Sequence, residues 1–306
     1  MKRLFTGKVL AVPSIMFTVL FWGFSYPSTK FLLAYLKPTE IAFYRFSLAA
    51  VFLSVASFFY KPARVEKQDL FRLIAGGAVG IPLYFIFENN GINLTTAGMA
   101  SMIIASIPVL NALAGTILGK EKNSPRRWLG IAMSFMGVYL IVNLGMGQPE
   151  GGRETLAGNL LVLLAAFTWV AFTRINEPLL KKYDSITVNI YQIIAGAFFL
   201  SFLALPGGVE LRRVFSVPVF LNLVYLGACC SALAYFFYMF ALQKLGPVAV
   251  TTFINLVPVF GVAGSILFLG ETLLPRQLLG GVIVVAGVTL VTFGDRAYAS
   301  TGRSSR

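Results

Sequence analysis

The chain has 306 residues, of which 57% are hydrophobic and 12% are charged, and it carries a net charge of +13 without a single histidine. Soluble globular chains are about 45–50% apolar and about 25% charged, so this composition excludes a single water-facing domain. The lack of histidine excludes His-based metal sites and Ser-His-Asp triads. The basic residues lie in short stretches between apolar runs, which favours a membrane-topology signal over a nucleic-acid surface.

Apolar runs long enough to cross a bilayer follow one another along the chain. A spanning helix needs about 20 apolar residues, and runs that are continuous rather than alternating exclude a membrane β-barrel. The runs cover 9–31, 40–59, 70–89, 96–118, 128–144, 159–180, 188–205, 218–242, 248–269 and 276–293. The sequence therefore predicts an all-α membrane protein with ten transmembrane helices.

Lys and Arg are divided unequally between the two sets of connecting segments. With a cytoplasmic N-terminus, 18 of the 25 basic residues lie in cytoplasmic segments, six lie outside and Arg45 lies within a span. Positive residues accumulate on the cytoplasmic side of membrane proteins. We therefore expect a multi-pass protein of a bacterial or archaeal cell (inner) membrane, with both termini in the cytoplasm.

The second half of the chain repeats the first at a shift of about 150 residues. Ile107-Pro108-Val109 aligns with Val257-Pro258-Val259, and the stretch that begins at Glu121 aligns without a gap with the stretch that begins at Glu271. The longest connection falls at the midpoint of the chain. We therefore predict a first five-helix repeat at 9–144, a linker loop at 145–157, a second repeat at 158–294 and a cytoplasmic tail at 295–306.

Five crossings are an odd number, so the second repeat must be inverted in the membrane relative to the first. Inverted repeats related by an axis in the membrane plane are typical of secondary transporters. They allow one central site to face either side of the membrane in turn.

Two segments carry a resemblance to a known family. Residues 94–122 read LTTAGMASMIIASIPVLNALAGTILGKEK and residues 245–271 read LGPVAVTTFINLVPVFGVAGSILFLGE. Both resemble the EamA domain of the drug/metabolite transporter superfamily, although the first copy has an extra residue between the Gly and the Glu of its final motif. The resemblance covers about residues 10–293. It implies ten helices, a substrate held between the halves, and movement of amino acids, other metabolites or drugs out of the cytoplasm.

Polar and aromatic residues that share a helix face are the candidates for substrate binding. On the ninth predicted helix, an amide at about mid-depth needs a partner other than lipid. On the first, a polar stripe includes a tryptophan, which three further aromatic residues would join as flat walls. Contacts between helices are the alternative role for all of them. The substrate-binding candidates are Trp22, Ser25, Tyr84, Trp169, Tyr235, Thr251 and Asn255.

Two prolines and two charged residues complete the set of candidates. Pro108 and Pro258 each remove a hydrogen bond to the preceding helical turn, which predicts a kink that either moves as a hinge or bends the helix permanently. Arg45 and Glu88 lie within spans at similar depth, near the outer side, which predicts an ion pair or a coupling site. The alternative is that Arg45 snorkels outward and that Glu88 lies at a hydrated helix end. With no charge expected at mid-depth, the site suits a neutral or zwitterionic solute, and a charge-coupled site at Glu88 is the alternative.

Together these features predict a secondary transporter that moves a small organic metabolite by alternating access, most simply exporting an amino acid or a related solute. A non-transporting receptor or scaffold and a channel are the alternatives. An enzyme is not expected, because there is no histidine and no central pair of carboxylates. We expect no metal and no other cofactor. The expected partners are the small-molecule substrate and the lipid bilayer but not nucleic acid, and a homodimer is left open.

Overall fold

The computed structural model describes residues 2–59, 62–118, 124–144, 153–209, 211–246, 250 and 253–301. Within these residues, seven helical segments are long and apolar enough to cross a membrane, and two apolar helices are shorter. The long segments are Val9–Leu32, Pro38–Phe59, Lys67–Leu94, Ala97–Ile117, Thr155–Lys182, Ser185–Gly207 and Val217–Leu245, and the shorter ones are Val257–Leu269 and Pro275–Val291. The remaining predicted span, 128–144, lies within a helix at Pro125–Leu144. The predicted all-α membrane fold is confirmed.

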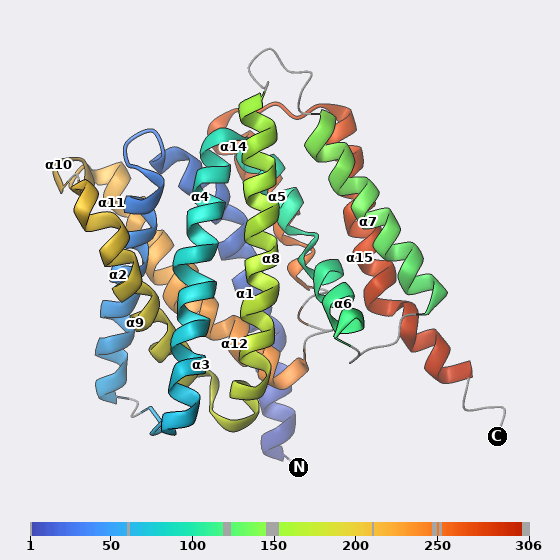
Figure 1. The fold of residues 1–306 in the computed structure, drawn as a ribbon, viewed down its shortest axis with the longest axis horizontal. Coiled ribbons are helices and arrows are strands. Elements are labelled where there is room, and N and C mark those ends of the chain that lie inside the picture. Colours follow the sequence, from blue (N-terminus) through green and yellow to red (C-terminus); the bar gives the residue numbers. More distant parts are fainter. Residues whose placement is uncertain are drawn as a thin grey trace.

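The helices form one bundle (Figure 1). The first half contains α1 (Lys2–Leu32), α2 (Pro38–Phe59), α3 (Lys67–Ala78), α4 (Tyr84–Leu94), α5 (Ala97–Ile104), α6 (Ile107–Ile117) and α7 (Pro125–Leu144). The second half contains α8 (Arg153–Lys182), α9 (Ser185–Ala204), α10 (Leu211–Val214), α11 (Val217–Val224), α12 (Ala234–Leu245), α14 (Val257–Leu269) and α15 (Pro275–Thr301). Most of the predicted linker lies outside the described residues, and α15 continues into the predicted tail.

Several spans are interrupted in the same way in both halves. A π-helical stretch at Val79–Leu83 joins α3 to α4, and another at Tyr225–Leu233 joins α11 to α12. The fourth span is broken between α5 and α6, and Pro108 is the second residue of α6. Pro258 is likewise the second residue of α14. Proline is favoured in the first turn of a helix because it lacks the N–H that would otherwise bond to the preceding turn, so each proline starts a new helix at the break.

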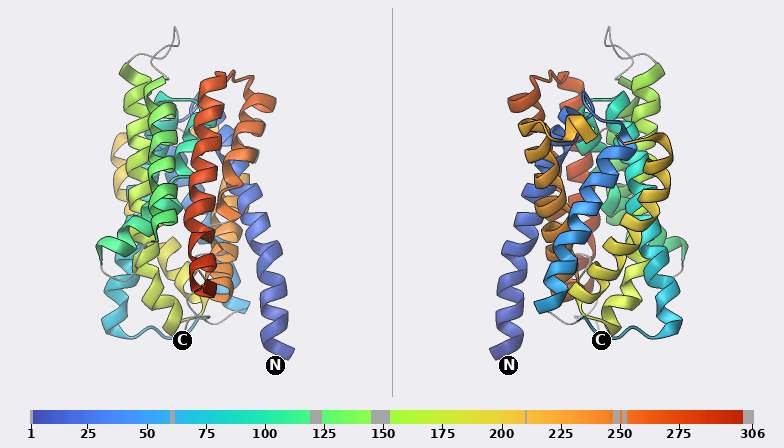
Figure 2. Two further views of the ribbon diagram at one scale, coloured as in Figure 1. Left: turned by 90° about the vertical axis from the view of Figure 1, so that its right-hand side faces the viewer. Right: turned by 90° about the vertical axis from the view of Figure 1, so that its left-hand side faces the viewer.

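Close contacts between glycines show how the two halves are related. A Cβ atom on Gly130 would lie 2.6 Å from the carbonyl oxygen of Gly287, and a Cβ on Gly137 would lie 2.6 Å from that of Gly280. Gly130 is the repeat equivalent of Gly280, and Gly137 is the equivalent of Gly287, so exchanging the halves converts one contact into the other. The order of the contacts makes α7 and α15 antiparallel, and the two helices lie side by side (Figures 1 and 2). This is the two-fold relation expected of inverted repeats.

The same relation holds nearer the centre of the bundle. A Cβ on Gly77 would lie 2.7 Å from the carbonyl oxygen of Gln192 on α9, and a Cβ on Gly227 would lie 3.0 Å from that of Arg45 on α2. The glycines are 150 residues apart and their partners are 147 apart. Small residues therefore allow the backbones of the two halves to approach closely where they meet.

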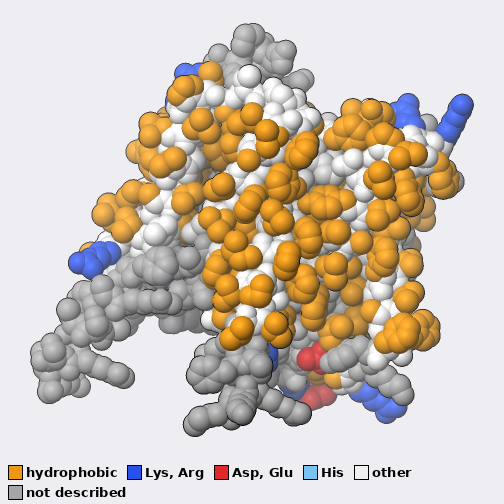
Figure 3. All heavy atoms as spheres, turned by 180° about the vertical axis from the view of Figure 1, so that it is seen from behind, with side chains coloured by type: hydrophobic (Ala, Val, Ile, Leu, Met, Phe, Trp, Pro, Cys, Tyr) orange, Lys and Arg blue, Asp and Glu red, His pale blue; other side chains and the backbone are white. Residues whose placement is uncertain are grey.

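The surface of the bundle suits a lipid environment. Seen from behind, hydrophobic side chains cover the middle of the molecule, and the visible charged side chains lie at its margins (Figure 3). Phe58, Phe59 and Phe71 are among the most exposed large hydrophobic residues. Helix α1 begins and α15 finishes at the same end of the bundle, which we name the termini end (Figure 1). The other end, where α5 begins, is named the opposite end.

Candidate functional site

A buried cavity lies where the two halves meet. Its volume is about 30 Å³, which is room for about two waters. Residues from both halves line it, and charged, aromatic and aliphatic side chains are all present. The lining residues are Trp22, Ser25, Tyr26, Arg45, Tyr84, Phe85, Glu88, Ile104, Ile107, Trp169, Tyr235, Ile254 and Val257.

The breaks in the fourth and ninth spans meet at this cavity. Ile104 and Ile107 flank the first break, and their repeat equivalents Ile254 and Val257 line the same cavity. Pro108 and Pro258 have no N–H to donate to the carbonyl oxygens of Ile104 and Ile254, four residues earlier. Backbone without regular helical bonds is tolerated at membrane depth where it is buried in protein or lines a polar cavity.

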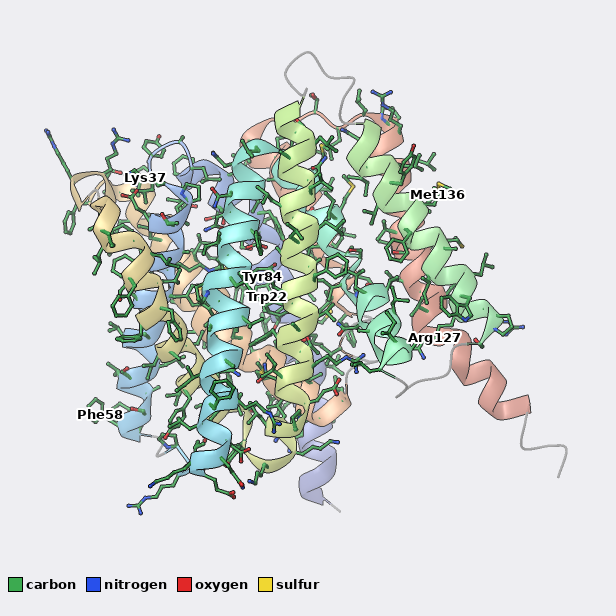
Figure 4. The ribbon with its side chains drawn as sticks, in the orientation of Figure 1. Trp22, Lys37, Phe58, Tyr84, Arg127 and Met136 are labelled. Carbon is green, nitrogen blue, oxygen red and sulfur yellow. The ribbon has the colours of Figure 1, made fainter. Side chains whose placement is uncertain are left out.

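Aromatic residues pack into a cluster on one side of the cavity. The ring of Trp22 lies 5.2 Å from that of Trp169 in an edge-to-face arrangement and 5.7 Å from that of Tyr235. Tyr84 lies 5.2 Å from Trp169. Trp22 and Tyr84 lie together at the centre of the molecule (Figure 4). The Trp22 Nε1 atom donates a hydrogen bond of 3.0 Å to the carbonyl oxygen of Cys230, which fixes its ring against the other half of the chain.

Arg45 points into the protein rather than towards water. Its side chain is 2% exposed, and its Nε atom donates a 2.6 Å hydrogen bond to the Ser231 hydroxyl. The guanidinium carbon lies 4.5 Å from the centre of the Phe85 ring, in a cation–π arrangement. The alternative that Arg45 snorkels outward is therefore wrong, because its guanidinium is held by polar and aromatic partners inside the bundle.

Glu88 faces the same cavity. It is 6% exposed and accepts a 2.6 Å hydrogen bond from the Tyr84 hydroxyl, and Tyr26 lies beside the same carboxylate. Arg45 and Glu88 are both described residues, and no nitrogen–oxygen distance of 4.0 Å or less joins them. Opposite charges from α2 and α4 therefore line one cavity without direct contact, which favours the alternative of a charged site at Glu88 over a lining of neutral groups alone.

The other predicted residues are only partly brought together. Ser25 lines the cavity and donates to the carbonyl oxygen of Trp22 at 2.7 Å. Asn255 is buried beside the lining residue Ile254 but does not itself line the cavity. Its Oδ1 atom has no hydrogen-bond partner among the residues that the structure describes. Thr251 lies outside the described residues.

Sequence reasoning missed three polar or aromatic residues of the site. Tyr26 follows Trp22 by one helical turn and could have been found from that spacing. Phe85 adjoins a predicted residue in sequence. Ser231 carried no signal, because its contact with Arg45 joins residues that are 186 positions apart. No cluster of three or more potential metal ligands occurs in the part of the chain that the structure describes.

Polar contacts join neighbouring segments at the opposite end of the bundle. The Glu271 carboxylate accepts hydrogen bonds of 2.8 and 3.0 Å from the backbone N–H groups of Ala97 and Gly98, so a residue of the second half caps helix α5 of the first. Lys30 donates to the carbonyl oxygens of Ile92 and Thr95 at 2.8 and 2.6 Å. These bonds tie α1, α4 and α5 to the segment before α15.

Another polar cluster joins the halves at the termini end. Lys182 lies 2.7 Å from carboxylate oxygens of both Glu66 and Asp69, and the Tyr183 hydroxyl donates to Asp69 at 2.8 Å. The hydrogen bond from Lys182 lowers the pKa of Glu66 below its ordinary value, so this carboxylate stays charged until the pH falls through that lowered pKa. The cavity therefore lies between two sets of polar contacts, one at each end.

Comparison with known families identifies the chain. A model of the EamA-like transporter family matches residues 9–143 and 156–293. The chain belongs to the EamA-like transporter family. This EamA protein is accordingly a multi-pass membrane transporter and not an enzyme, and it consists of two related halves. A small-molecule substrate is implied by its family.

Curated relatives of this EamA transporter occur in archaea and bacteria. An uncharacterized transporter of Archaeoglobus fulgidus is 32% identical over 90% of this chain and 94% of its own. A probable terminal-alkyne amino-acid exporter of Streptantibioticus cattleyicolor is 29% identical over 95% of this chain and 97% of its own. A probable amino-acid metabolite efflux pump of Salmonella typhimurium is 27% identical over 92% and 94%. One solved crystal structure shares the fold, with a TM-score of 0.68 at 15% identity over 92% of this chain and 97% of that one.

Proposed function

We propose that this EamA transporter exports a small organic metabolite, an amino acid or a related solute, by alternating access. The observation that carries the proposal is the cavity at the junction of the inverted halves, which both broken spans reach and which lies between the polar clusters at the two ends of the bundle. Inverted repeats around a central site provide the geometry for alternating exposure. The names of two relatives, an amino-acid exporter and an amino-acid metabolite efflux pump, support the substrate class and the direction.

In this proposal the predicted residues have separate roles. The cavity residues Trp22, Ser25, Tyr84, Trp169 and Tyr235 contact the solute, and the breaks at Pro108 and Pro258 act as hinges. Asn255, beside the lining residue Ile254, joins the site when the halves separate, and Thr251 stays a candidate because it shares the predicted helix face of Asn255. The unpartnered Oδ1 of Asn255 would then accept a hydrogen bond from the solute.

The topology and assembly are part of the same proposal. The bias of Lys and Arg supports cytoplasmic termini in a bacterial or archaeal inner membrane, with repeats at 9–144 and 158–294 joined by a loop at 145–157. A reporter fused after Arg306 and active only in the cytoplasm tests the orientation. Mass photometry of the protein in lipid nanodiscs tests for a homodimer.

Counterflow in proteoliposomes tests the transport proposal. Vesicles loaded with unlabelled amino acid should accumulate the labelled compound transiently, because a carrier exchanges solute across the membrane, whereas a channel or a scaffold does not. Trp22→Ala should abolish the overshoot, while the matched change Trp128→Ala should preserve it, since Trp128 is 47% exposed on the surface. Equal activity of the two variants, or equilibration without an overshoot, would contradict the proposal. Faster efflux from preloaded cells that express the protein tests the direction.

A further inference from the structure

The two charges in the cavity set its recognition chemistry. Burying a charged side chain without a partner is costly, and ionisable residues inside membrane spans are accordingly rare and tend to serve a function. Arg45 and Glu88 are both buried, both line the cavity, and have no direct ion pair with each other. The fold thus keeps two opposite charges apart in one small space.

Each charge is only partly satisfied by the protein. Nε of Arg45 bonds to Ser231, and the two terminal nitrogens of the guanidinium have no hydrogen-bond partner among the described residues. The Glu88 carboxylate accepts a hydrogen bond from the Tyr84 hydroxyl and has the Tyr26 hydroxyl beside it. Its two oxygens offer about four acceptor positions, so positions remain for a ligand. The two terminal NH2 groups of Arg45 and the carboxylate of Glu88 can therefore still bind a ligand.

The balance of charge decides the class of that ligand. A cation would satisfy Glu88 and leave Arg45 unpaired, and an anion would do the reverse. A zwitterion satisfies both. Resting on the proposed function, we infer that the cavity recognises the zwitterionic head of an α-amino acid, with the carboxylate held by Arg45 and the ammonium group by Glu88. A planar guanidinium binds a carboxylate through two parallel hydrogen bonds, which suits this assignment.

The rest of the lining sets the preferred side chain. Ile104, Ile107, Ile254 and Val257 form an aliphatic wall, and Trp22 and Trp169 present aromatic surfaces. These residues offer no further charge to a ligand, so the geometry favours an apolar side chain. The cavity has room for about two waters, whereas even the smallest α-amino acid has five heavy atoms, so the cavity must widen before one can bind. Binding is thereby coupled to movement of the two halves.

The test compares ligands that differ by one charge. Purified protein is screened by its melting temperature against L-alanine, L-leucine and L-phenylalanine, since a ligand that binds the folded state raises stability. If L-leucine gives the largest shift, it is compared with two singly charged derivatives. L-leucinamide lacks the carboxylate, and 4-methylpentanoate lacks the ammonium group. Each should bind roughly tenfold or more weakly, which is the loss expected for one charged hydrogen-bond partner. The amide and the deaminated acid of the other two amino acids serve in the same way.

Charge-switched variants sharpen the assignment. Glu88→Gln should weaken the binding of L-leucine and strengthen the binding of 4-methylpentanoate, because the cavity then holds only the positive charge of Arg45 and prefers a monoanion. Arg45→Gln should weaken the binding of L-leucine and strengthen the binding of isopentylamine, which is leucine without its carboxylate. Glu177→Gln and Arg126→Gln, which lie outside the cavity lining, should bind as the unchanged protein does. If a variant fails to fold, the ligand series on the unchanged protein still decides.

Several outcomes would overturn the inference. One is the absence of a melting-temperature shift with all three amino acids. Another is equal binding of an amino acid and its singly charged derivative. A third is an equal loss of binding for every ligand in Glu88→Gln and Arg45→Gln. Counterflow of an uncharged solute alone would refute the zwitterion site and leave the transport proposal standing. Charge-specific binding without counterflow would refute transport and leave the site standing.

Discussion

At the scale of single residues, Arg45 is positioned by the other half of the chain. The hydroxyl of Ser231, on the π-helical stretch between α11 and α12, accepts a hydrogen bond from Nε of Arg45. The Phe85 ring lies against the Arg45 guanidinium. The position of the positive charge therefore depends on how the two halves are docked. Movement between the halves would change both the cavity and the charge within it.

Ser231→Ala should disturb this arrangement. The variant leaves Nε of Arg45 without its partner in a buried position, which costs about 1.5–3 kcal/mol for a hydrogen bond to a charged group. We expect a lower melting temperature and a higher apparent KM for the transported solute. Ser201→Ala serves as control, because the Ser201 hydroxyl bonds only to the backbone of its own helix, at Phe198. Identical behaviour of the two variants would show that Ser231 does not position Arg45.

At the scale of helices, α7 and α15 are held together by contacts that only glycine allows. Gly130 and Gly137 face Gly287 and Gly280 with backbone atoms closer than a Cβ would tolerate. Such close approach is how membrane helices gain packing energy when hydrophobic burial against lipid provides none. The pair therefore joins the two halves through main chain rather than through large side chains.

Gly137→Ala should separate these helices. The new Cβ would lie 2.6 Å from the carbonyl oxygen of Gly280 and 2.8 Å from the backbone nitrogen of Val284, and backbone cannot rotate away as a side chain can. We expect a loss of roughly 1–3 kcal/mol, as for other overpacked sites. Gly207→Ala is the matched control, because nothing lies within 4 Å of its Cβ position. Unfolding in mild detergent measures both, and an equal stability of the two variants would contradict the packing argument.

At the scale of the whole molecule, the proposed alternating access assigns the two polar clusters the role of closing opposite ends of the bundle in turn. Lys182→Ala removes ion pairs at the termini end, and Glu271→Ala removes the cap of α5 at the opposite end. Weakening one end should favour the state that is open at that end. The two substitutions should therefore shift the protein in opposite directions.

A reactive group in the cavity would report this shift. With Ser25→Cys as the target, an impermeant maleimide should label faster from the termini side in Lys182→Ala and from the opposite side in Glu271→Ala. The same variants without Ser25→Cys correct for labelling of the native Cys229 and Cys230. Arg126→Ala, a change at an exposed residue, combined with Ser25→Cys should be labelled at the same rate as Ser25→Cys alone. Faster labelling from the same side in both variants would argue against two separate closures.

The sequence predicts the bundle well because the bilayer imposes simple rules of length and polarity on each span. Hydropathy predicts the helices, and matching glycines and prolines indicate the repeat. The site was harder to predict, since hydropathy gives the depth of a residue but not the direction of its side chain. Arg45 and Glu88 were found as unusual residues near one side, yet their rotation into a common cavity depends on the docking of α2, α4 and α12. The partnership of Arg45 with Ser231 is a tertiary contact that no local pattern encodes.

The equivalence of Gly77 with Gly227 has a consequence for direction. Exchanging the halves puts Gln192 in the place of Arg45, so the backbone environment is matched while a positive charge is replaced by a neutral amide. If the halves exchange conformations during a transport cycle, its two end states are related by a two-fold rotation in architecture and are unequal in electrostatic energy. The empty carrier would then occupy its two states unequally, with no extra domain needed to create the difference. Transport would then be kinetically asymmetric, while the direction of net flux would still follow the gradient of the solute.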